Sequence, residues 1–309
     1  MKTAFLFPGQ GAQSPGMGSD LYLSYSRYRE VFDRCEAGVG IDLKAACFKG
    51  EGMETSDVIQ PAIYAHSVAT LRQLEAEGLT ADFLAGLSLG EYAALTAAGV
   101  LDEAQGARLV RRRGALMDGA VPPGTGGMLS VVGLTLEQVE AAIAGRANIF
   151  VSNHLSETQL VLGGLLSELN ALKPALEAAG SRMLTMLAMK GPSHCPLLNE
   201  AADQFEKELS GEALFAPSQS VYSNALGTLY PAGADIRALL CTQMKTRVRW
   251  HDCVEDLLAR GVTRFVEIGP GGVLTKMLKR RVGREIQLFC VQDEASLESF
   301  LRANAEGSV

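Results

Sequence analysis

Ser88 lies in the sequence Gly-Leu-Ser-Leu-Gly over residues 86–90, whose spacing is typical of a nucleophilic serine. The apolar residues 83–86 predict a strand, and a helix is predicted to begin near Leu89. The serine is therefore expected on the sharp turn between them, which needs glycine on both sides because other side chains would not fit. At the start of the helix, the backbone N–H of Leu89 is placed to stabilise a developing oxyanion.

His194 is the candidate base for this serine. It lies in Gly-Pro-Ser-His-Cys-Pro over residues 191–196, and Pro196 fits the first turn of a helix predicted over 196–209. A helix N-terminus disfavours a charged imidazole, which leaves a neutral ring able to accept a proton. The alternative is a hydrogen-bonded loop histidine. The base is favoured because the chain has only four histidines and this one lies between glycine and prolines.

Arg113 is the candidate anion-binding residue. Its helix is predicted over 103–119, and Arg113 falls within the apolar stripe of that helix. A buried arginine needs an anion because an unpaired charge away from water is costly. That anion is either a protein carboxylate or the carboxylate of a substrate. The neighbouring Arg111 and Arg112 are expected on the solvated face. The stripe consists of Leu109, Val110, Leu116 and Met117.

The loop over residues 7–14 reads Phe-Pro-Gly-Gln-Gly-Ala-Gln-Ser and follows the first predicted strand. Its Gly-x-Gly resembles the start of a dinucleotide-binding loop, but Ser14 occupies the place of the third glycine. No acidic residue ends an obvious second strand, so nicotinamide binding is not expected. Gln10, flanked by glycines, is instead predicted to present its backbone N–H as a second oxyanion donor beside that of Leu89.

Composition restricts the class of protein. The 309 residues are 47% hydrophobic and 20% charged, which is ordinary for a globular protein with a large core. No apolar run is long enough to span a bilayer, and the N-terminus enters a strand with no signal peptide. The six cysteines include no Cys-x-x-Cys pair, so reduced thiols and a cytoplasmic location are expected. The net charge of -7 argues against a nucleic-acid partner.

Strand-like apolar runs alternate with helical spacing over much of the chain, which predicts an α/β fold with a mostly parallel sheet. Strands are predicted at 2–7, 83–86, 221–224 and 264–268, and helices at 24–36, 60–78, 89–98, 103–119, 235–244 and 251–260.

The middle of the chain has a different order of elements. After the break Gly-Thr-Gly-Gly at 124–127, the pattern predicts β-α-β-β-α-β, which is the ferredoxin-like arrangement. We therefore expect residues 124–190 to form a small inserted domain. Residues 1–123 and 191–309 would form the larger domain. The expected elements are strands 128–132, 149–152, 160–162 and 182–187 and helices 135–144 and 165–179.

Taken together, the motifs resemble those of malonyl-coenzyme A:acyl carrier protein transacylases of fatty acid synthesis, and of the related polyketide acyltransferases. The resemblance covers nearly the whole chain, and the motifs occur in the family's order. They are residues 7–13, 86–92, 113–117, 191–194, 243–250 and 267–274.

The resemblance implies an α/β-hydrolase-like catalytic domain with the ferredoxin-like insertion. It implies that Ser88 is the acylated nucleophile and His194 its base, while Arg113 binds the free carboxylate of the malonyl group. Gln10 and Leu89 would supply the oxyanion hole. The backbone carbonyl of Gln243 would orient His194, so that a dyad replaces the usual triad.

The same resemblance implies a ping-pong reaction between a coenzyme A thioester and the phosphopantetheine thiol of acyl carrier protein. No metal or other cofactor is expected, and neither is a membrane partner. The protein is expected to be a monomer. Because the carrier is expected to be acidic, docking would need a local basic patch. The densest candidate is Lys276, Lys279, Arg280, Arg281 and Arg284, although a solvated face would look the same.

Three positions depart from the family's pattern, and all lie in motifs expected near the acyl or pantetheine site. Leu87 replaces a histidine before the serine, and Leu155 replaces the second asparagine of a loop motif. Ser193 replaces a bulkier phenylalanine before His194. We expect Ser193 to loosen the acyl pocket, so that α-substituted malonyl units are transferred as well as malonyl.

Other function classes fit less well. An acyl hydrolase would have no reason to keep a carboxylate-binding arginine in a core stripe. A non-catalytic binding module would not need Ser88, His194 and two oxyanion donors together. A standalone polyketide acyltransferase would look nearly identical in sequence and stays open as an alternative.

Overall fold

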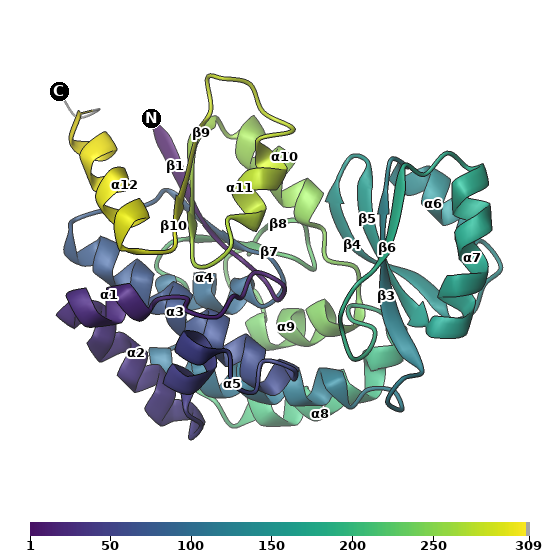
Figure 1. The fold of residues 1–309 in the computed structure, drawn as a ribbon, viewed down its shortest axis with the longest axis horizontal. Coiled ribbons are helices and arrows are strands. Elements are labelled where there is room, and N and C mark those ends of the chain that lie inside the picture. Colours follow the sequence, from purple (N-terminus) through teal and green to yellow (C-terminus); the bar gives the residue numbers. More distant parts are fainter. Residues whose placement is uncertain (307–309) are drawn as a thin grey trace. The chain divides into compact units, whose positions relative to one another are not determined.

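The computed structural model describes residues 1–306, and the chain divides into two compact units. The first unit comprises Met1–Gly114, Ala213–Tyr222 and Asp256–Val309, and the second comprises Ala115–Glu212 and Ser223–Glu255. Within the described residues, no helix combines the length and the apolar character that crossing a membrane requires. Figure 1 shows the course of the chain and the labels used below.

A parallel sheet forms the centre of the first unit. Strand β1 lies in the middle of the order β10-β9-β1-β2-β7, and neighbouring strands in this order are parallel. Because these strands are parallel, their carboxyl ends lie at the same edge of the sheet, which is where α/β proteins place their sites. The strands are β1 (Lys2–Phe7), β2 (Phe83–Gly86), β7 (Ser220–Ser223), β9 (Val262–Ile268) and β10 (Gln287–Val291).

Helices pack around this sheet. Helix α4 contacts β1 and β2, α11 contacts β9 and β10, and α12 contacts β10, while α3 packs on α2 and α4. Most residues of helix α3 are buried between other elements, and polar side chains such as Gln60, His66 and Thr70 are among them. The helices are α1 (Ser19–Ser24), α2 (Ser26–Val39), α3 (Ser56–Ala76), α4 (Gly90–Ala97), α5 (Glu103–Asp118), α11 (Val273–Leu278) and α12 (Glu294–Glu306), with a π-helical turn at Ala45–Lys49.

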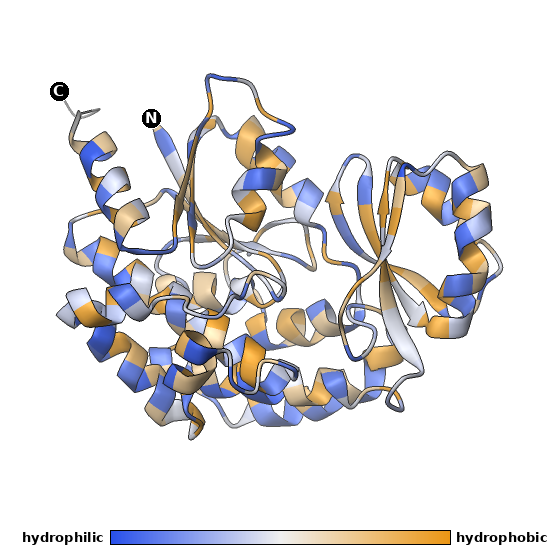
Figure 2. Cartoon of the chain, viewed as in Figure 1, coloured by the Kyte–Doolittle hydropathy of each residue, from blue (hydrophilic) through white to orange (hydrophobic). Residues whose placement is uncertain are grey.

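The second unit contains an antiparallel sheet with the order β4-β5-β3-β6. Helices α6 and α7 pack against it, and their apolar residues join those of the strands in one buried core. Figure 2 shows hydrophobic residues along these helices and strands. The elements are β3 (Gly126–Val132), α6 (Leu136–Ile143), β4 (Ile149–Ser156), β5 (Gln159–Leu165), α7 (Leu166–Ala178) and β6 (Met183–Met186).

The remaining helices of this unit follow the sheet. A 3₁₀ turn at Pro196–Leu198 leads into α8 (Asn199–Ser210), which packs on α9 (Ile236–Lys245). The short strand β8 (Thr228–Leu229) precedes α9. Helix α10 (Trp250–Ala259) begins in the second unit and ends in the first, and α5 runs from the first unit into the second.

The α/β fold with a parallel sheet is confirmed, and the strands predicted at 2–7 and 83–86 match residue for residue. The helix predicted over 24–36 is wrong at its start, because extended Tyr25 separates α1 from α2. The helix predicted from 196 begins instead with the 3₁₀ turn. The terminal elements α11, β10 and α12 were not predicted.

The order β-α-β-β-α-β predicted for the middle of the chain is present over residues 126–186. The compact unit that contains it is larger than the expected segment 124–190, because α8 and α9 are grouped with the sheet. Where an inserted domain begins and ends therefore stays a prediction.

Candidate active site

Ser88 occupies the turn between β2 and α4 with a backbone φ of 54°. In residues 1–306, Ser88 and His194 are the two non-glycine residues with positive φ. This conformation is costly for a residue with a Cβ atom and tends to cluster at functional sites. The turn is the strand–turn–helix geometry of a nucleophilic elbow.

The flanking glycines are required by close backbone contacts. A Cβ atom on Gly86 would lie 1.9 Å from the carbonyl carbon of Gly90, and one on Gly90 would lie 2.1 Å from the oxygen of Phe7. Both distances are far below van der Waals contact. The Gly-x-Ser-x-Gly pattern thus reflects the packing of this turn against the end of β1.

The loop after β1 lies beside the serine turn. Phe7 and Gly86 are paired in register, and a Cβ on Gly9 would meet the carbonyl oxygen of Leu87 at 2.7 Å. The side chain of Gln10 turns to helix α3: its Nε2 donates to Ser56 Oγ at 3.0 Å, and its Oε1 accepts from Gln60 Nε2 at 3.3 Å. The segments that carry Gln10 and Leu89 are therefore adjacent.

Arg113 is buried, with only 1% of its surface exposed. Its guanidinium donates to Ser88 Oγ at 2.9 Å and to Gln60 Oε1 at 2.8 Å, and its Cζ lies 5.6 Å from the centre of the Tyr92 ring. Burial lowers the pKa of Arg113, while the Coulomb interactions with Tyr92 and Glu91 act in the opposite direction. The cation is thus held at the hydroxyl of the candidate nucleophile.

The prediction for the three consecutive arginines is confirmed for Arg112 and Arg113 but is wrong for Arg111, which is half-buried rather than on the solvated face. Arg112 is exposed, Arg111 donates to the carbonyl oxygen of Val39, and Arg113 is buried. The position of Arg113 within the apolar stripe of α5 accounts for this difference, because that stripe faces the interior.

His194 lies in the second unit and is 3% exposed, with a φ of 54°. Its Nδ1 is 2.7 Å from the backbone oxygen of Gln243. Since a carbonyl oxygen can only accept, Nδ1 carries the proton and donates. In the neutral ring, Nε2 then keeps a lone pair with which it can accept a proton.

The carbonyl that holds His194 comes from the last turn of α9. The final carbonyl groups of a helix have no partner within the helix, so they are available to other donors. Gln243 is fully buried, and the neighbouring Thr242 carbonyl accepts instead from Thr246 Oγ1 at 2.8 Å. The contact expected between His194 and Gln243 is therefore present and has a local cause.

The neighbours of His194 are also buried. Ser193 is 3% exposed. Burial raises the pKa of the Cys195 thiol to about 11, so that it stays protonated and is a poor nucleophile at neutral pH. A cavity of roughly 300 Å³ lies beside His194, walled by Ile143, Ile149, Phe150 and Val151 and bordered by the ion pair of Glu140 and Arg247 at 2.9 Å.

Two site residues were missed by sequence reasoning. Gln60 hydrogen bonds both Arg113 and Gln10, and Ser56 hydrogen bonds Gln10. A signal for Gln60 was present in the sequence, because it interrupts the otherwise apolar stretch 58–65, and the structure buries it to 1% exposed. Its partners are 50 or more residues away in the sequence, and no local pattern identifies them.

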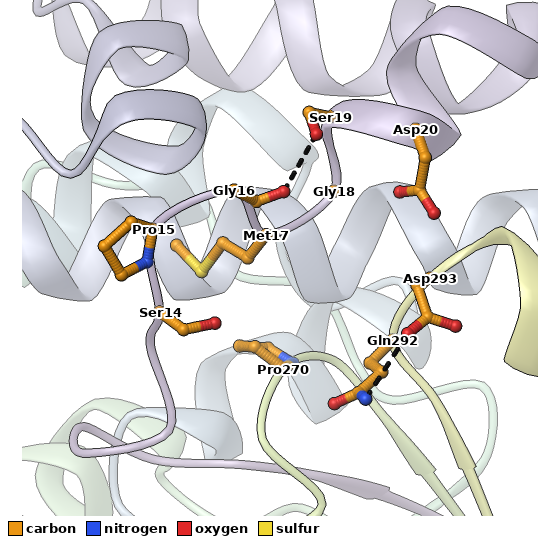
Figure 3. Close-up of a pocket in the computed structure, with 10 residues that line it drawn as sticks. All are labelled: Ser14, Pro15, Gly16, Met17, Gly18, Ser19, Asp20, Pro270, Gln292 and Asp293. Atoms are coloured by element: carbon orange, nitrogen blue, oxygen red, sulfur yellow. Dashed lines mark hydrogen bonds between the residues drawn. The ribbon is translucent and has the colours of Figure 1, made fainter.

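Sequence reasoning predicted no site at a further cavity of the first unit, which measures about 390 Å³ (Figure 3). The carboxylates of Asp20 and Asp293 line it, but both already hold helix ends. Asp20 accepts from the N–H of Glu294 at 2.8 Å, and Asp293 accepts from that of Ser296 at 2.8 Å. Within residues 1–306, no group of three or more His, Cys, Asp or Glu side chains is arranged to hold a metal ion.

Comparison with known proteins identifies the family. Residues 4–298 match the family model described as "Acyl transferase domain". The chain belongs to this acyl transferase family. It is 38% identical to the malonyl CoA-acyl carrier protein transacylase of Escherichia coli (strain K12) over 285 residues, or 90% of this chain and 92% of the relative.

Solved structures agree with this assignment. The crystal structure of malonyl CoA-acyl carrier protein transacylase from Clostridium perfringens ATCC 13124 superposes on this acyl transferase with a TM-score of 0.95 at 34% identity, covering 100% of this chain and 98% of the other. A malonyl-transacylase solved in complex with its type II PKS acyl-carrier protein gives a TM-score of 0.93 at 36% identity, covering 98% and 100%.

Proposed function

We propose that this acyl transferase moves a malonyl group from malonyl-coenzyme A to the phosphopantetheine thiol of acyl carrier protein, through an ester on Ser88. The observation that carries the proposal is the buried guanidinium of Arg113 at 2.9 Å from the Ser88 hydroxyl, which itself sits on a strained turn. A nucleophile and a carboxylate-binding group are thereby adjacent. The relatives' names state the same malonyl transfer.

In the first half-reaction, Ser88 Oγ attacks the thioester carbonyl while Nε2 of His194 takes the hydroxyl proton. The backbone N–H groups of Gln10 and Leu89 stabilise the oxyanion of the tetrahedral intermediate. The intermediate collapses to the seryl ester, and the imidazolium returns the proton to the departing coenzyme A thiolate. In the second half, the carrier's thiol gives its proton to His194 and attacks the ester. The second tetrahedral intermediate then collapses by breaking the bond between the acyl carbon and Ser88 Oγ, and His194 returns the proton to the serine oxygen.

Gln243 determines which nitrogen of His194 exchanges the proton in this cycle. Its carbonyl accepts from Nδ1–H, so that Nε2 is the nitrogen that exchanges the proton, and the same carbonyl stabilises the imidazolium that forms. A backbone carbonyl thus takes the place that an aspartate has in a triad.

Arg113 selects the acyl group. A malonyl unit on Ser88 ends in a carboxylate, which can replace the serine hydroxyl as the acceptor of Nη2–H and form a charge-assisted pair. Gln60 holds the other guanidinium nitrogen at 2.8 Å, which fixes the plane of the group. An acyl group without a carboxylate would leave the buried cation without this pair.

We also propose that the fold consists of an α/β-hydrolase-like catalytic domain and a ferredoxin-like small domain. The sheet order β4-β5-β3-β6 and its two helices support a ferredoxin-like small domain. The parallel sheet with a nucleophilic elbow after β2 supports an α/β-hydrolase-like catalytic domain.

We also propose a cytoplasmic monomer that needs no metal or other cofactor and binds neither nucleic acid nor membrane.

The side chains of the predicted basic patch are exposed, which suits docking of an acidic carrier protein. Transfer to a polyketide carrier is the alternative, because buried Ser193 next to His194 leaves more room for an α-substituted acyl unit than phenylalanine would. Charge reversal at Arg280 and Arg281 should raise KM for the carrier and leave KM for malonyl-coenzyme A unchanged.

Intact-mass measurement tests the proposal. Incubation with malonyl-coenzyme A should add the mass of one malonyl group, and peptide mapping should place it on Ser88. Acetyl- and methylmalonyl-coenzyme A are run in parallel to define the acyl class. Absence of any acyl adduct with all three thioesters would overturn the proposal.

A further inference from the structure

The loop that carries His194 receives a hydrogen bond from a residue outside the motifs of the proposed reaction. Ser152 Oγ donates to the backbone oxygen of Ser193, the residue directly before His194. Ser152 is fully buried on strand β4, and 41 residues separate the two partners in the sequence.

The strand is irregular at this point. The pairing of β4 with β5 shifts register between Val151 and Asn153, so that Ser152 is the extra residue of a β-bulge. Bulges turn a side chain away from its regular direction and occur often beside active sites. Here the bulge accompanies the contact of the Ser152 hydroxyl with the histidine loop.

Room for this hydroxyl is provided by a glycine on the neighbouring strand. A Cβ atom on Gly163 would lie 2.3 Å from Ser152 Oγ and 3.1 Å from the oxygen of Ser193. A side chain at residue 163 would therefore displace the donor, the acceptor or both. The hydrogen bond of Ser152 therefore depends on the absence of a side chain at Gly163.

The backbone of Ser152 is tied to the other partner of the histidine. Its carbonyl oxygen accepts from the N–H of Val248 at 2.8 Å, and Val248 follows Gln243 by five residues. Ser152 is thus bonded through its side chain to the loop of His194 and through its main chain to the segment after Gln243. Together with the contact between His194 Nδ1 and Gln243 oxygen, these bonds close a ring.

We infer that Ser152 is a positioning residue for His194. By holding the carbonyl before His194, its hydroxyl maintains the left-handed backbone that directs the imidazole to the Gln243 carbonyl. A non-glycine residue keeps such a conformation only when its surroundings determine it. This inference rests on the proposed role of His194 as the base.

Ser152→Ala tests the inference, because it removes the donor without adding volume. We expect the rate of Ser88 acylation to fall between about 10- and 100-fold with an unchanged KM for malonyl-coenzyme A, since a base that is misplaced loses rate rather than binding. The nitrogen and proton NMR signals of the His194 imidazole should show loss of the single Nδ1-protonated form. Ser152→Thr, which keeps the hydroxyl, should recover most of the rate.

Gly163→Ala is a second way to break the same bond. Because both substitutions act on one hydrogen bond, Gly163→Ala should have a smaller effect in the Ser152→Ala protein than in the natural one. Ser130→Ala is the matched control, a serine on strand β3 of the same sheet, and should change neither the rate nor the imidazole signals.

His194→Ala separates this inference from the proposed function. If His194→Ala abolishes acylation while Ser152→Ala keeps the natural rate and imidazole signals, the positioning role of Ser152 is wrong. If Ser152→Ala lowers the rate but leaves the imidazole signals unchanged, its role is only structural and the inference is overturned. If His194→Ala itself acylates normally, the proposed base is wrong.

Discussion

The turn at Ser88 and the loop at His194 share a backbone φ of 54° but are held in different ways. At Ser88 the constraint is local and steric, because Gly86 and Gly90 let the strand, the turn and the helix approach closely. At His194 it comes from a distance, through hydrogen bonds from Ser152 and to Gln243. A turn that is fixed by contacts between neighbouring residues can be recognised from a short sequence motif. A loop that is fixed by hydrogen bonds to distant residues cannot.

The largest expected effects come from removing the two reacting groups themselves. Ser88→Ala should abolish acyl labelling, because no other group replaces the hydroxyl oxygen. His194→Ala should slow labelling by about 10²–10⁴-fold, since only the proton transfer is lost. Intact-mass time courses with malonyl-coenzyme A measure both. Labelling that persists in Ser88→Ala would show that Ser88 is not the nucleophile.

Arg113→Ala is expected to change the preference between acyl groups rather than abolish acyl transfer. Losing the buried pair with the malonyl carboxylate should cost about 3–5 kcal/mol for malonyl transfer. Acetyl transfer should be kept or improved. The measurement is kcat/KM for the two thioesters, with exposed Arg112→Ala as the matched control from the same helix. Equal losses for both thioesters would assign Arg113 a structural role.

The comparison of the two regions also explains what could be predicted from the sequence. Strands 2–7 and 83–86, the turn at Ser88 and the burial of Arg113 follow from short-range patterns, and the structure has them as predicted. Gln60 and Ser152 act through partners 53 and 41 residues away. Periodicity carries no information on such pairs, because each partner alone looks like an ordinary buried polar residue.

His66 should make the first unit sensitive to acid. It is fully buried beside Tyr28, with Nδ1 2.7 Å from the hydroxyl, and burial lowers its pKa to about 4. The unfolded chain has a histidine pKa near 6.5 and so binds more protons between about pH 6.5 and 4. The contribution of neutral His66 to the free energy of unfolding is therefore fully present above about pH 6.5. It is lost as the pH falls towards 4, by up to about 3 kcal/mol.

Urea unfolding of the natural protein and of His66→Gln between pH 7 and pH 4 measures this effect. The variant should start less stable and lose less stability over the range. Parallel curves for the two proteins would contradict the assignment. The experiment also separates acid unfolding from any effect of pH on the chemical steps in activity measurements.

Ser193→Phe tests whether the histidine loop sets the size of the acyl group. A phenyl ring beside the imidazole should exclude the α-methyl of methylmalonyl, which discriminates by about 1–3 kcal/mol. The ratio of kcat/KM for methylmalonyl- over malonyl-coenzyme A should fall accordingly. Ser193→Ala, which adds no volume, is the control and should keep the natural ratio. A natural protein that already excludes methylmalonyl as strictly as the variant would contradict the pocket interpretation.

The smallest expected effect compares the backbone strain of the two regions directly. Ser88→Gly should be more stable than Ser88→Ala by roughly 1 kcal/mol, because glycine reaches a φ of this sign without the Cβ penalty. Ser130, on strand β3, supplies the control, and there alanine should be the more stable of the two. The same pair of substitutions at His194 should give a similar advantage to glycine. Free energies of unfolding in urea measure all three pairs. A glycine advantage at Ser88 without one at His194 would mean that the hydrogen bonds around the histidine loop, rather than its φ, decide its energy.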